Sequence, residues 1–116
     1  MEPRVRDNIE KLIHAIGECR QEIEERGKKR AHAIRTYDMK LAIALATLRN
    51  AEFYELAGQK YKSPPVSIAE KIAKGIVSQE REAMELAESG YKACISNLEA
   101  LKAQLNGYQS IFRHLE

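Results

Sequence analysis

Residues 91–115 read YKACISNLEALKAQLNGYQSIFRHL, and their apolar side chains recur at alternating spacings of three and four. The positions in this seam are Tyr91, Cys94, Leu98, Leu101, Leu105, Tyr108, Phe112 and Leu115. Apolar residues at this interval form one stripe along an α-helix, which is the pattern that keeps one helix packed along another. The stretch therefore predicts a long helix in a coiled-coil-like pairing.

This helix is predicted to extend back to about residue 68 and forward to about residue 114. Ser67 and Glu70 have the spacing of a capping box, in which each side chain accepts a hydrogen bond from the other residue's backbone N–H. The upstream seam is weaker, through Ile72, Ile76, Ala83 and Ala87. Two consecutive prolines, Pro64 and Pro65, cannot lie inside a helix. A loop is therefore predicted over residues 58–67, with Gly58 ending the helix before it.

The first half of the chain carries two further seams. One consists of Ile9, Leu12, Ile16, Cys19 and Ile23, and the other of Ile34, Tyr37, Leu41, Ala44, Leu48 and Ala51. The eleven residues from Ile23 to Ile34 insert four into the heptad register, a stutter that unwinds a supercoil without breaking the helix. The polar stretch between the seams contains Gly27. We favour one helix over about 5–57, with a break at Gly27 as the alternative.

These elements predict an all-α fold in a single domain over residues 1–116. Two long helices fold back at the Pro-Pro loop into an antiparallel, coiled-coil-like hairpin, and hairpins assemble into a multi-helix bundle. A break at Gly27 would instead allow a three-helix bundle within one chain. The expected pairing sets Cys19 opposite about residue 105, about 16 Å along the hairpin from Cys94, which argues against a disulfide within the chain.

The stretch from Met39 to Leu48 is apolar on nearly every side and would lie across from roughly residues 76–85. One neighbouring helix cannot cover a segment that is apolar all round. We therefore expect a second copy of the chain to cover it, giving a homodimer or tetramer. The residues expected to carry self-association are Met39, Leu41, Ile43, Leu45 and Leu48.

Positive charge is concentrated within ten residues of the first helix, at Arg26, Lys28, Lys29, Arg30 and Arg35. Clustered Arg and Lys is the electrostatic footprint of a nucleic-acid binder, in which phosphate contacts give sequence-independent affinity. An acidic run from Glu80 to Glu88 is expected to lie near Lys40, so part of the positive charge has a structural explanation. This cluster of positive charge has two interpretations. It is either a solvated helix face or a site for a nucleic-acid backbone or an acidic partner.

Nothing in the sequence predicts catalysis, a metal site or a cofactor. The three histidines lack the Glu-x-x-His spacing of a di-iron bundle, and the six glycines are scattered rather than gathered in a phosphate loop. No stretch approaches the roughly 20 apolar residues of a membrane-spanning helix, and no signal peptide is recognised at the N-terminus. With two cysteines inside apolar helical patterns, a cytoplasmic protein with reduced thiols is expected.

From residue 34 to 116 the chain resembles small uncharacterised α-helical proteins of phages and prophages of Gram-positive bacteria. The resemblance is carried by Tyr37-Asp38, by the segment 98–105 (LEALKAQL) and by Ile111-Phe112-Arg113. Such proteins are often encoded in recombination modules, beside single-strand-binding functions. The resemblance implies a phage setting, in a bacterial host, and transfers no active-site residue.

The leading hypothesis is a non-enzymatic, self-associating helical phage accessory protein that acts beside DNA recombination or replication. It would bind single-stranded nucleic acid or a nucleic-acid-processing protein through exposed helical faces. A second hypothesis is a phage inhibitor of a host defence nuclease (anti-CRISPR-like). A third is a structural or assembly protein without a nucleic-acid role.

Overall fold

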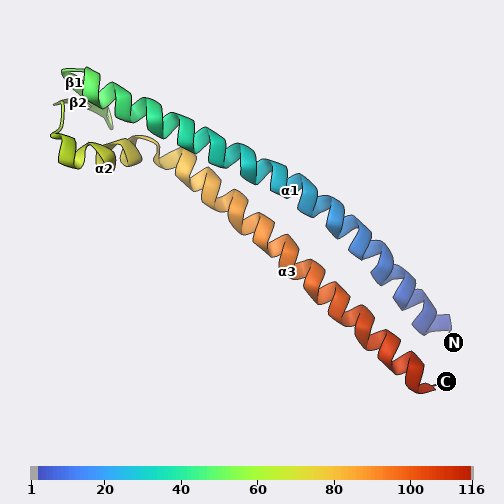
Figure 1. Cartoon of the computed structure of the whole chain (residues 1–116). Helices are drawn as coiled ribbons and strands as arrows, with labels where there is room; N and C mark the ends of the chain where they lie inside the picture. Colours follow the sequence, from blue (N-terminus) through green and yellow to red (C-terminus); the bar gives the residue numbers. More distant parts are fainter. Residues whose placement is uncertain (1–2, 116) are drawn as a thin grey trace. The chain divides into compact units, whose positions relative to one another are not determined.

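The computed structural model describes residues 3–115, which form three helices and one short β-hairpin (Figure 1). In chain order these are α1 (Pro3–Asn50), β1 (Phe53–Leu56), β2 (Gln59–Lys62), α2 (Val66–Ile76) and α3 (Ser78–Leu115). The all-α prediction is confirmed, and so is the hairpin-like pairing of α1 with α3. None of the described helices is long and apolar enough to span a bilayer.

The chain divides into two compact units. Unit 1 consists of Met1–Lys29 with Glu88–Glu116, and unit 2 consists of Arg30–Ala87. The two helices of unit 1 run antiparallel. Asn8 near the start of α1 accordingly contacts Tyr108 near the end of α3. In unit 2, Lys40 of α1 contacts Glu80 at the start of α3. A single domain remains a prediction.

The helix α1 is continuous through Gly27, so the predicted continuity is confirmed and the alternative break at Gly27 is wrong. Packing in unit 1 explains the glycine. The ring of Tyr91 lies 3.4 Å from the position that a Cβ on Gly27 would occupy. One residue away, the guanidinium of Arg26 lies over Gly90 of α3, 2.9 Å from its corresponding Cβ position. Two glycines therefore let α1 and α3 approach closely at this level.

The seams predicted for both halves of α1 and for residues 91–112 point inward. Ile16, Cys19, Ala44 and Leu48 are buried, and the other seam residues are half-buried. The side chain of Leu115, the last predicted seam position, lies outside the described part of the chain. The heptad pattern therefore located the packing surface of α1 and of α3 from Tyr91 onward.

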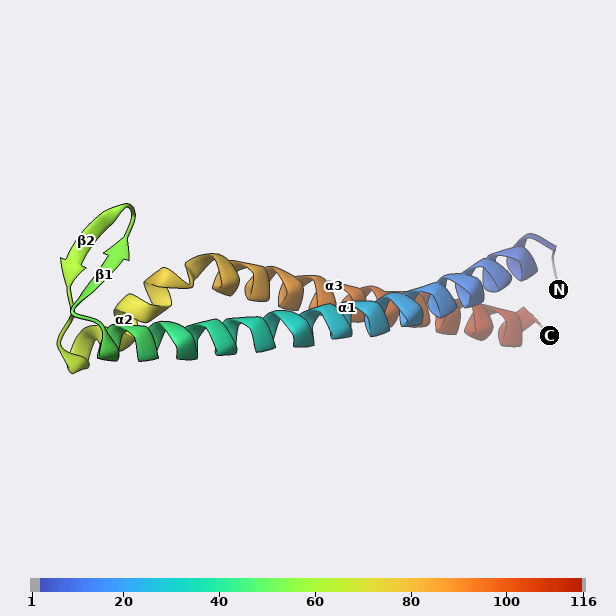
Figure 2. The same ribbon diagram turned by 90° about the horizontal axis from the view of Figure 1, so that it is seen from above.

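The first helix ends at Asn50, not near Ala57 as predicted, and a β-hairpin follows it (Figure 2). Ala57 and Gly58 form the two-residue turn with φ of 53° and 78°, the sign that a type I′ turn requires at both positions. The rings of Tyr54 and Tyr61, opposite one another in the register, stack with centroids 5.5 Å apart. Gly58 is therefore a hairpin residue rather than a helix terminator.

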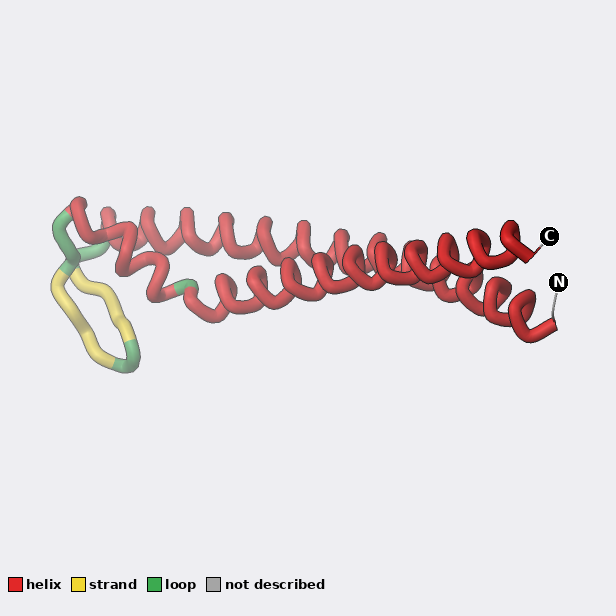
Figure 3. The backbone as a smooth tube through the Cα atoms, turned by 90° about the horizontal axis from the view of Figure 1, so that it is seen from below, coloured by secondary structure: helices red, strands yellow, loops and turns green. Residues whose placement is uncertain are grey.

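The second predicted helix is two helices, α2 and α3, separated at Val77 (Figure 3). The predicted capping box is wrong. Helix α2 starts earlier, with Pro65 as its N-cap and no side-chain cap, and the Pro65 carbonyl accepts from the N–H groups of Ile68 and Ala69. The upstream seam is confirmed at Ile72 and Ala87, which are half-buried, and corrected at Ile76 and Ala83, which are exposed. Its inward positions are Ala69, Ile72, Ala73, Val77, Glu80, Met84 and Ala87.

The core of unit 2 forms where α2 packs against the end of α1. It contains Ala44 and Leu48 from α1 with Ala73 and Val77 from the other side. Ala73 is 0 % exposed and Leu48 is 2 % exposed. Tyr54 of β1 packs against the same cluster, which attaches the β-hairpin to the core. Small residues at positions 44 and 73 allow the two helices to approach.

Candidate assembly surface

The five predicted self-association residues divide between the inside and the outside of unit 2. Leu48 is buried in the core, and Leu41 and Leu45 pack against that core. Met39 and Ile43 are 57 % and 58 % exposed, one helical turn apart on α1. The chain thus uses three of these residues for its own packing. Met39 and Ile43 are the two that remain open to a partner.

A groove in unit 2 collects further exposed apolar side chains beside Ile43. Its volume is about 540 Å³, and it is lined by α1, by β1 and by the end of α2 with the start of α3. Ile43, Phe53 and Ile76 line it with exposures of 58 %, 54 % and 38 %. The buried side chains of Leu48 and Val77 also border it. Apolar groups that are half exposed around a hollow are what a second apolar surface can bury.

One ion pair also lines this groove. Lys40 Nζ lies 3.0 Å from Glu80 Oε1, which confirms the predicted proximity of Lys40 to the acidic run. The hydrogen bond from Lys40 lowers the pKa of the Glu80 carboxyl, with help from a backbone hydrogen bond. The Glu80 carboxyl therefore stays ionised at pH values below the ordinary pKa of a glutamate. The pair places a charged group beside the apolar lining, which would orient whatever docks there.

Two groove residues, Phe53 and Ile76, were missed by the sequence reasoning as partner-facing positions. Phe53 was assigned to the end of a helix, whereas it lies in β1. Ile76 was placed on an inward seam, whereas the break at Val77 turns it outward. The sequence offers little signal for this hairpin, because β1 and β2 do not alternate in burial and Ala-Gly is not among the favoured type I′ pairs.

The five residues of the predicted basic cluster all lie on α1, in different environments. Arg26 Nη2 lies 3.5 Å from Glu22, and Lys28 Nζ lies 3.5 Å from Glu24. Lys29 is exposed and Arg30 is half-buried. Arg35 is exposed, with Nη2 3.3 Å from His32 Nδ1. Arg26 and Lys28 are thus each paired with an acid one turn away, at the level of weak surface pairs.

A second basic site, on β2, has an aromatic at its centre. Lys60, Tyr61 and Lys62 are all exposed, and the Tyr61 ring is stacked on Tyr54. Glu55 is the cross-strand neighbour of Lys60. Tyr61 also donates a hydrogen bond from its hydroxyl to Gln59, at 2.8 Å. Aromatic side chains flanked by lysine are the combination that single-stranded nucleic acids contact.

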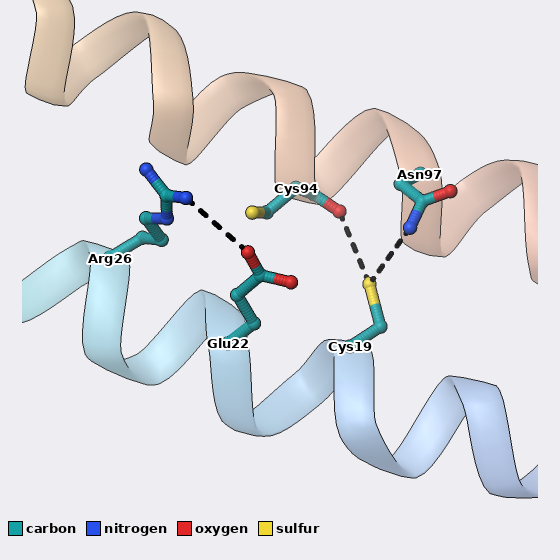
Figure 4. Close-up of polar contacts among 5 residues, drawn as sticks. All are labelled: Cys19, Glu22, Arg26, Cys94 and Asn97. Atoms are coloured by element: carbon teal, nitrogen blue, oxygen red, sulfur yellow. Dashed lines mark hydrogen bonds and ion pairs between the residues drawn. The ribbon is translucent and has the colours of Figure 1, made fainter.

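Unit 1 contains a polar group of side chains between its two helices (Figure 4). Cys19 Sγ donates to the backbone carbonyl of Cys94 at 3.5 Å and accepts from Asn97 Nδ2 at 3.8 Å. Burial raises the pKa of the Cys94 thiol, and the neighbouring Glu22 carboxylate raises it further. The predicted separation of the two cysteines is therefore wrong.

The reason for this correction is the length of α1. Ending the helix at Asn50 rather than near residue 57 removes about two turns from the first arm, or about 10 Å. The pairing of the two arms shifts in the same direction, and the partner of Cys19 moves from about residue 105 to residues 94–97. The misplaced end of α1 thus accounts for most of the error in the predicted pairing of Cys19.

No three His, Cys, Asp or Glu side chains gather as a metal ligand set within the described residues. Glu18, which shares a helix face with His14, lies 2.9 Å from its Nε2. Comparison with known proteins gave no matching family model, no matching curated protein and no matching solved structure.

Proposed function

We propose that the chain is a non-enzymatic binding protein that self-associates through unit 2, with a second copy of the chain as the occupant of the groove. The observation that carries this proposal is the gathering of exposed Ile43, Phe53 and Ile76 around one hollow. Water contact with these side chains costs free energy, at about 25 cal/mol per Å² of apolar surface. A second copy brings the same apolar groups, so a two-fold contact buries both sets.

Light scattering on a size-exclusion column tests this proposal. The wild-type protein is expected to have the mass of a dimer or tetramer. The variant Ile43→Glu/Phe53→Glu is expected to be monomeric, because two carboxylates would be desolvated in the contact. A matched control is Ile13→Glu/Ile111→Glu in unit 1, whose two isoleucines are 55 % and 54 % exposed.

The control variant is expected to keep the wild-type mass. A monomeric wild-type protein would overturn self-association. If both variants dissociate alike, the contact is not confined to unit 2. If only the unit 1 variant dissociates, the surface lies in the other unit. Circular dichroism checks that each variant retains its helix content.

A second proposed activity, binding of a nucleic-acid backbone, is supported by the exposed lysines around Tyr61 and by the exposed members of the basic cluster. Lys29 and Arg35 of α1 would contact phosphates, and Arg26, Lys28 and Arg30 would contribute to the local positive potential. Tyr61 would stack on a base. With this activity the protein would act beside DNA recombination or replication, the setting that the resemblance to phage proteins favours.

Fluorescence anisotropy of a labelled single-stranded oligonucleotide tests this activity. Affinity is expected to fall steeply with salt, with a log–log slope of about 0.7 per phosphate contacted. The variant Lys28→Glu/Lys29→Glu/Arg35→Glu changes three exposed residues and should weaken binding and lower the salt slope. Its control, Lys92→Glu/Lys102→Glu/Arg113→Glu, makes the same change of charge on α3 and should bind as the wild type does.

The other two hypotheses make different predictions for the same sample. An inhibitor of a host defence nuclease would bind one specific host protein tightly. It would not need to bind the oligonucleotide with an affinity that falls with salt. A structural or assembly protein would self-associate and bind neither. If adding the protein at low salt leaves the anisotropy of the oligonucleotide unchanged while the protein remains an oligomer, the inhibitor and structural hypotheses are favoured.

A further inference from the structure

The two cysteines of the chain lie on adjacent helices of unit 1 and are in contact through the Cys19 sulfur, although they are 75 positions apart in sequence. Cys19 is 4 % exposed, and its Sγ points to the backbone of Cys94 at 3.5 Å. Cys94 is half-buried, and its side chain lies between the two helices next to Glu22 (Figure 4). Both are free thiols. The Cys19 sulfur thus already contacts the backbone of Cys94, and rotation of the two side chains decides whether the sulfurs meet.

We propose that Cys19 and Cys94 form a reversible disulfide site, oxidised by a low-molecular-weight disulfide, that covalently joins α1 to α3 within unit 1. Cys19 has to turn its sulfur from the Cys94 carbonyl toward the Cys94 sulfur. The contacts that hold it in place are one weak S–H···O hydrogen bond and one long contact from Asn97. Such contacts are weak compared with a covalent bond, so the rotation is inexpensive.

The reaction proceeds by two thiol–disulfide exchanges. The Cys94 thiolate, on the more accessible residue, attacks one sulfur of oxidised glutathione, and the first glutathione thiolate leaves. The Cys19 thiolate then attacks the Cys94 sulfur in the mixed disulfide and displaces the second glutathione thiolate. The protein loses two electrons and two protons, and one glutathione disulfide becomes two glutathione thiols.

Glu22 controls how readily this happens. Burial and the Glu22 carboxylate both raise the pKa of Cys94, which reduces its thiolate fraction at neutral pH. The reduced form therefore persists under mild conditions, and oxidation accelerates as the pH rises toward that pKa. Glu22 acts as a positioning residue for this reaction, since it sets the charge beside the sulfur without touching the oxidant.

The disulfide closes a loop that contains all of unit 2. A loop of this length removes much conformational entropy from the unfolded chain, so the thermal midpoint should rise on the order of 10 °C on oxidation. The disulfide lies within unit 1 and does not involve the groove residues Ile43 and Phe53. The oxidised protein should therefore keep whatever oligomeric mass the reduced protein has.

The experiment treats the full-length protein with oxidised glutathione across neutral to alkaline pH. Intact-mass spectrometry should show loss of two hydrogen atoms, and non-reducing electrophoresis should show a faster-migrating monomer. A peptide map should join the segments around Cys19 and Cys94, and a phosphine reductant should reverse all three signals. The variants Cys19→Ser and Cys94→Ser should lack the fast species, and Glu22→Gln should form it faster at neutral pH.

Three results would overturn the proposal. One is a stable adduct of glutathione on Cys94 without ring closure, which would mean that Cys19 cannot reach it. Another is a covalent dimer, which would place the bond between chains. The third is no reaction of the folded wild-type protein even at alkaline pH, while the protein unfolded in urea reacts. Because light scattering measures self-association separately, a failed disulfide leaves the test of the groove intact.

Discussion

Unit 1 and unit 2 use the same long helix α1 and differ in how completely they cover it. Unit 1 leaves only Ile13 and Ile111 exposed among its large apolar side chains in the described part of the chain. Unit 2 leaves a larger set exposed, namely Met39, Ile43, Phe53, Leu56, Tyr61, Val66, Ile68, Ile76 and Leu86. Yet unit 2 also holds the most deeply buried residue, Ala73.

The difference follows from the width of the apolar stripe on each part of α1. In unit 1 a narrow seam faces a matching seam on α3, and two helices are enough to cover both. In unit 2 the segment 39–48 is apolar nearly all round, so α2 and the start of α3 cover one side and leave another open. A well-packed core and an uncovered face therefore arise from the same segment.

The largest effect expected from this comparison is on the core of unit 2. Leu48→Ala should lower the free energy of unfolding by about 3 kcal/mol, because it leaves a cavity at a side chain only 2 % exposed. Leu86→Ala, at a side chain 66 % exposed, should change it by less than about 0.5 kcal/mol. Urea denaturation measures both. Equal losses would mean that unit 2 has no core of its own.

The close approach of α1 and α3 in unit 1 is tested by replacing glycines of α3 with alanine and measuring the stability of each variant. Gly107→Ala, with no atom within 4 Å of the new Cβ, should stabilise the protein by about 1 kcal/mol through helix propensity. Gly90→Ala should stabilise it by less, since Arg26 Nη1 lies 2.9 Å from the new Cβ and must move. Arg26 is 44 % exposed, so it can swing into water. A destabilised Gly90→Ala protein would mean that Arg26 is held more firmly than this exposure indicates.

A glycine substitution in the turn of the β-hairpin of unit 2 should change the stability of the protein by a smaller amount, in a direction that can be stated in advance. Ala57 has a φ of 53°, a left-handed conformation that costs a residue with a Cβ about 1 kcal/mol. Ala57→Gly removes that strain but loosens the unfolded chain, for a net gain of about 0.5 kcal/mol. Ala31→Gly, at an exposed position inside α1, should instead cost about 1 kcal/mol. Thermal melts of the two variants should shift in opposite directions.

The smallest effect concerns the ion pair beside the groove, Lys40–Glu80. The folded-state pKa of Glu80 is lowered below its ordinary 4.5, so its contribution to stability is present above 4.5 and lost as the pH falls through the folded value. Lys40→Gln should therefore destabilise the protein slightly at neutral pH, and this deficit should shrink in acid as Glu80 becomes protonated. Urea midpoints at neutral and at acid pH give the difference. A deficit that persists in acid would point to packing rather than charge.

The site was less predictable than the fold, and the reason lies at two chain positions. The hairpin turn uses Ala57-Gly58, where the strong local signal for a turn, Asn or Asp before Gly, is absent. The break at Val77 carries no proline or glycine at that residue, and Val77 is buried there in one cluster with Leu48 and Ala73. Because Phe53 and Ile76 flank these two positions, neither could be assigned to the groove from the sequence.

The sequence by itself determined the helical class and the inward face of both halves of α1 and of residues 91–112, because a period near 3.6 residues states which side chains share a face. It favoured continuity through Gly27 over a break, and the structure decided for the continuous helix. The sequence also predicted the proximity of Lys40 to the acidic run. Only the tertiary structure decided where α1 stops, and with it the register that brings Cys19 to Cys94. Register depends on the length of the connection between helices, and a heptad repeat fits equally well at every shift of seven residues.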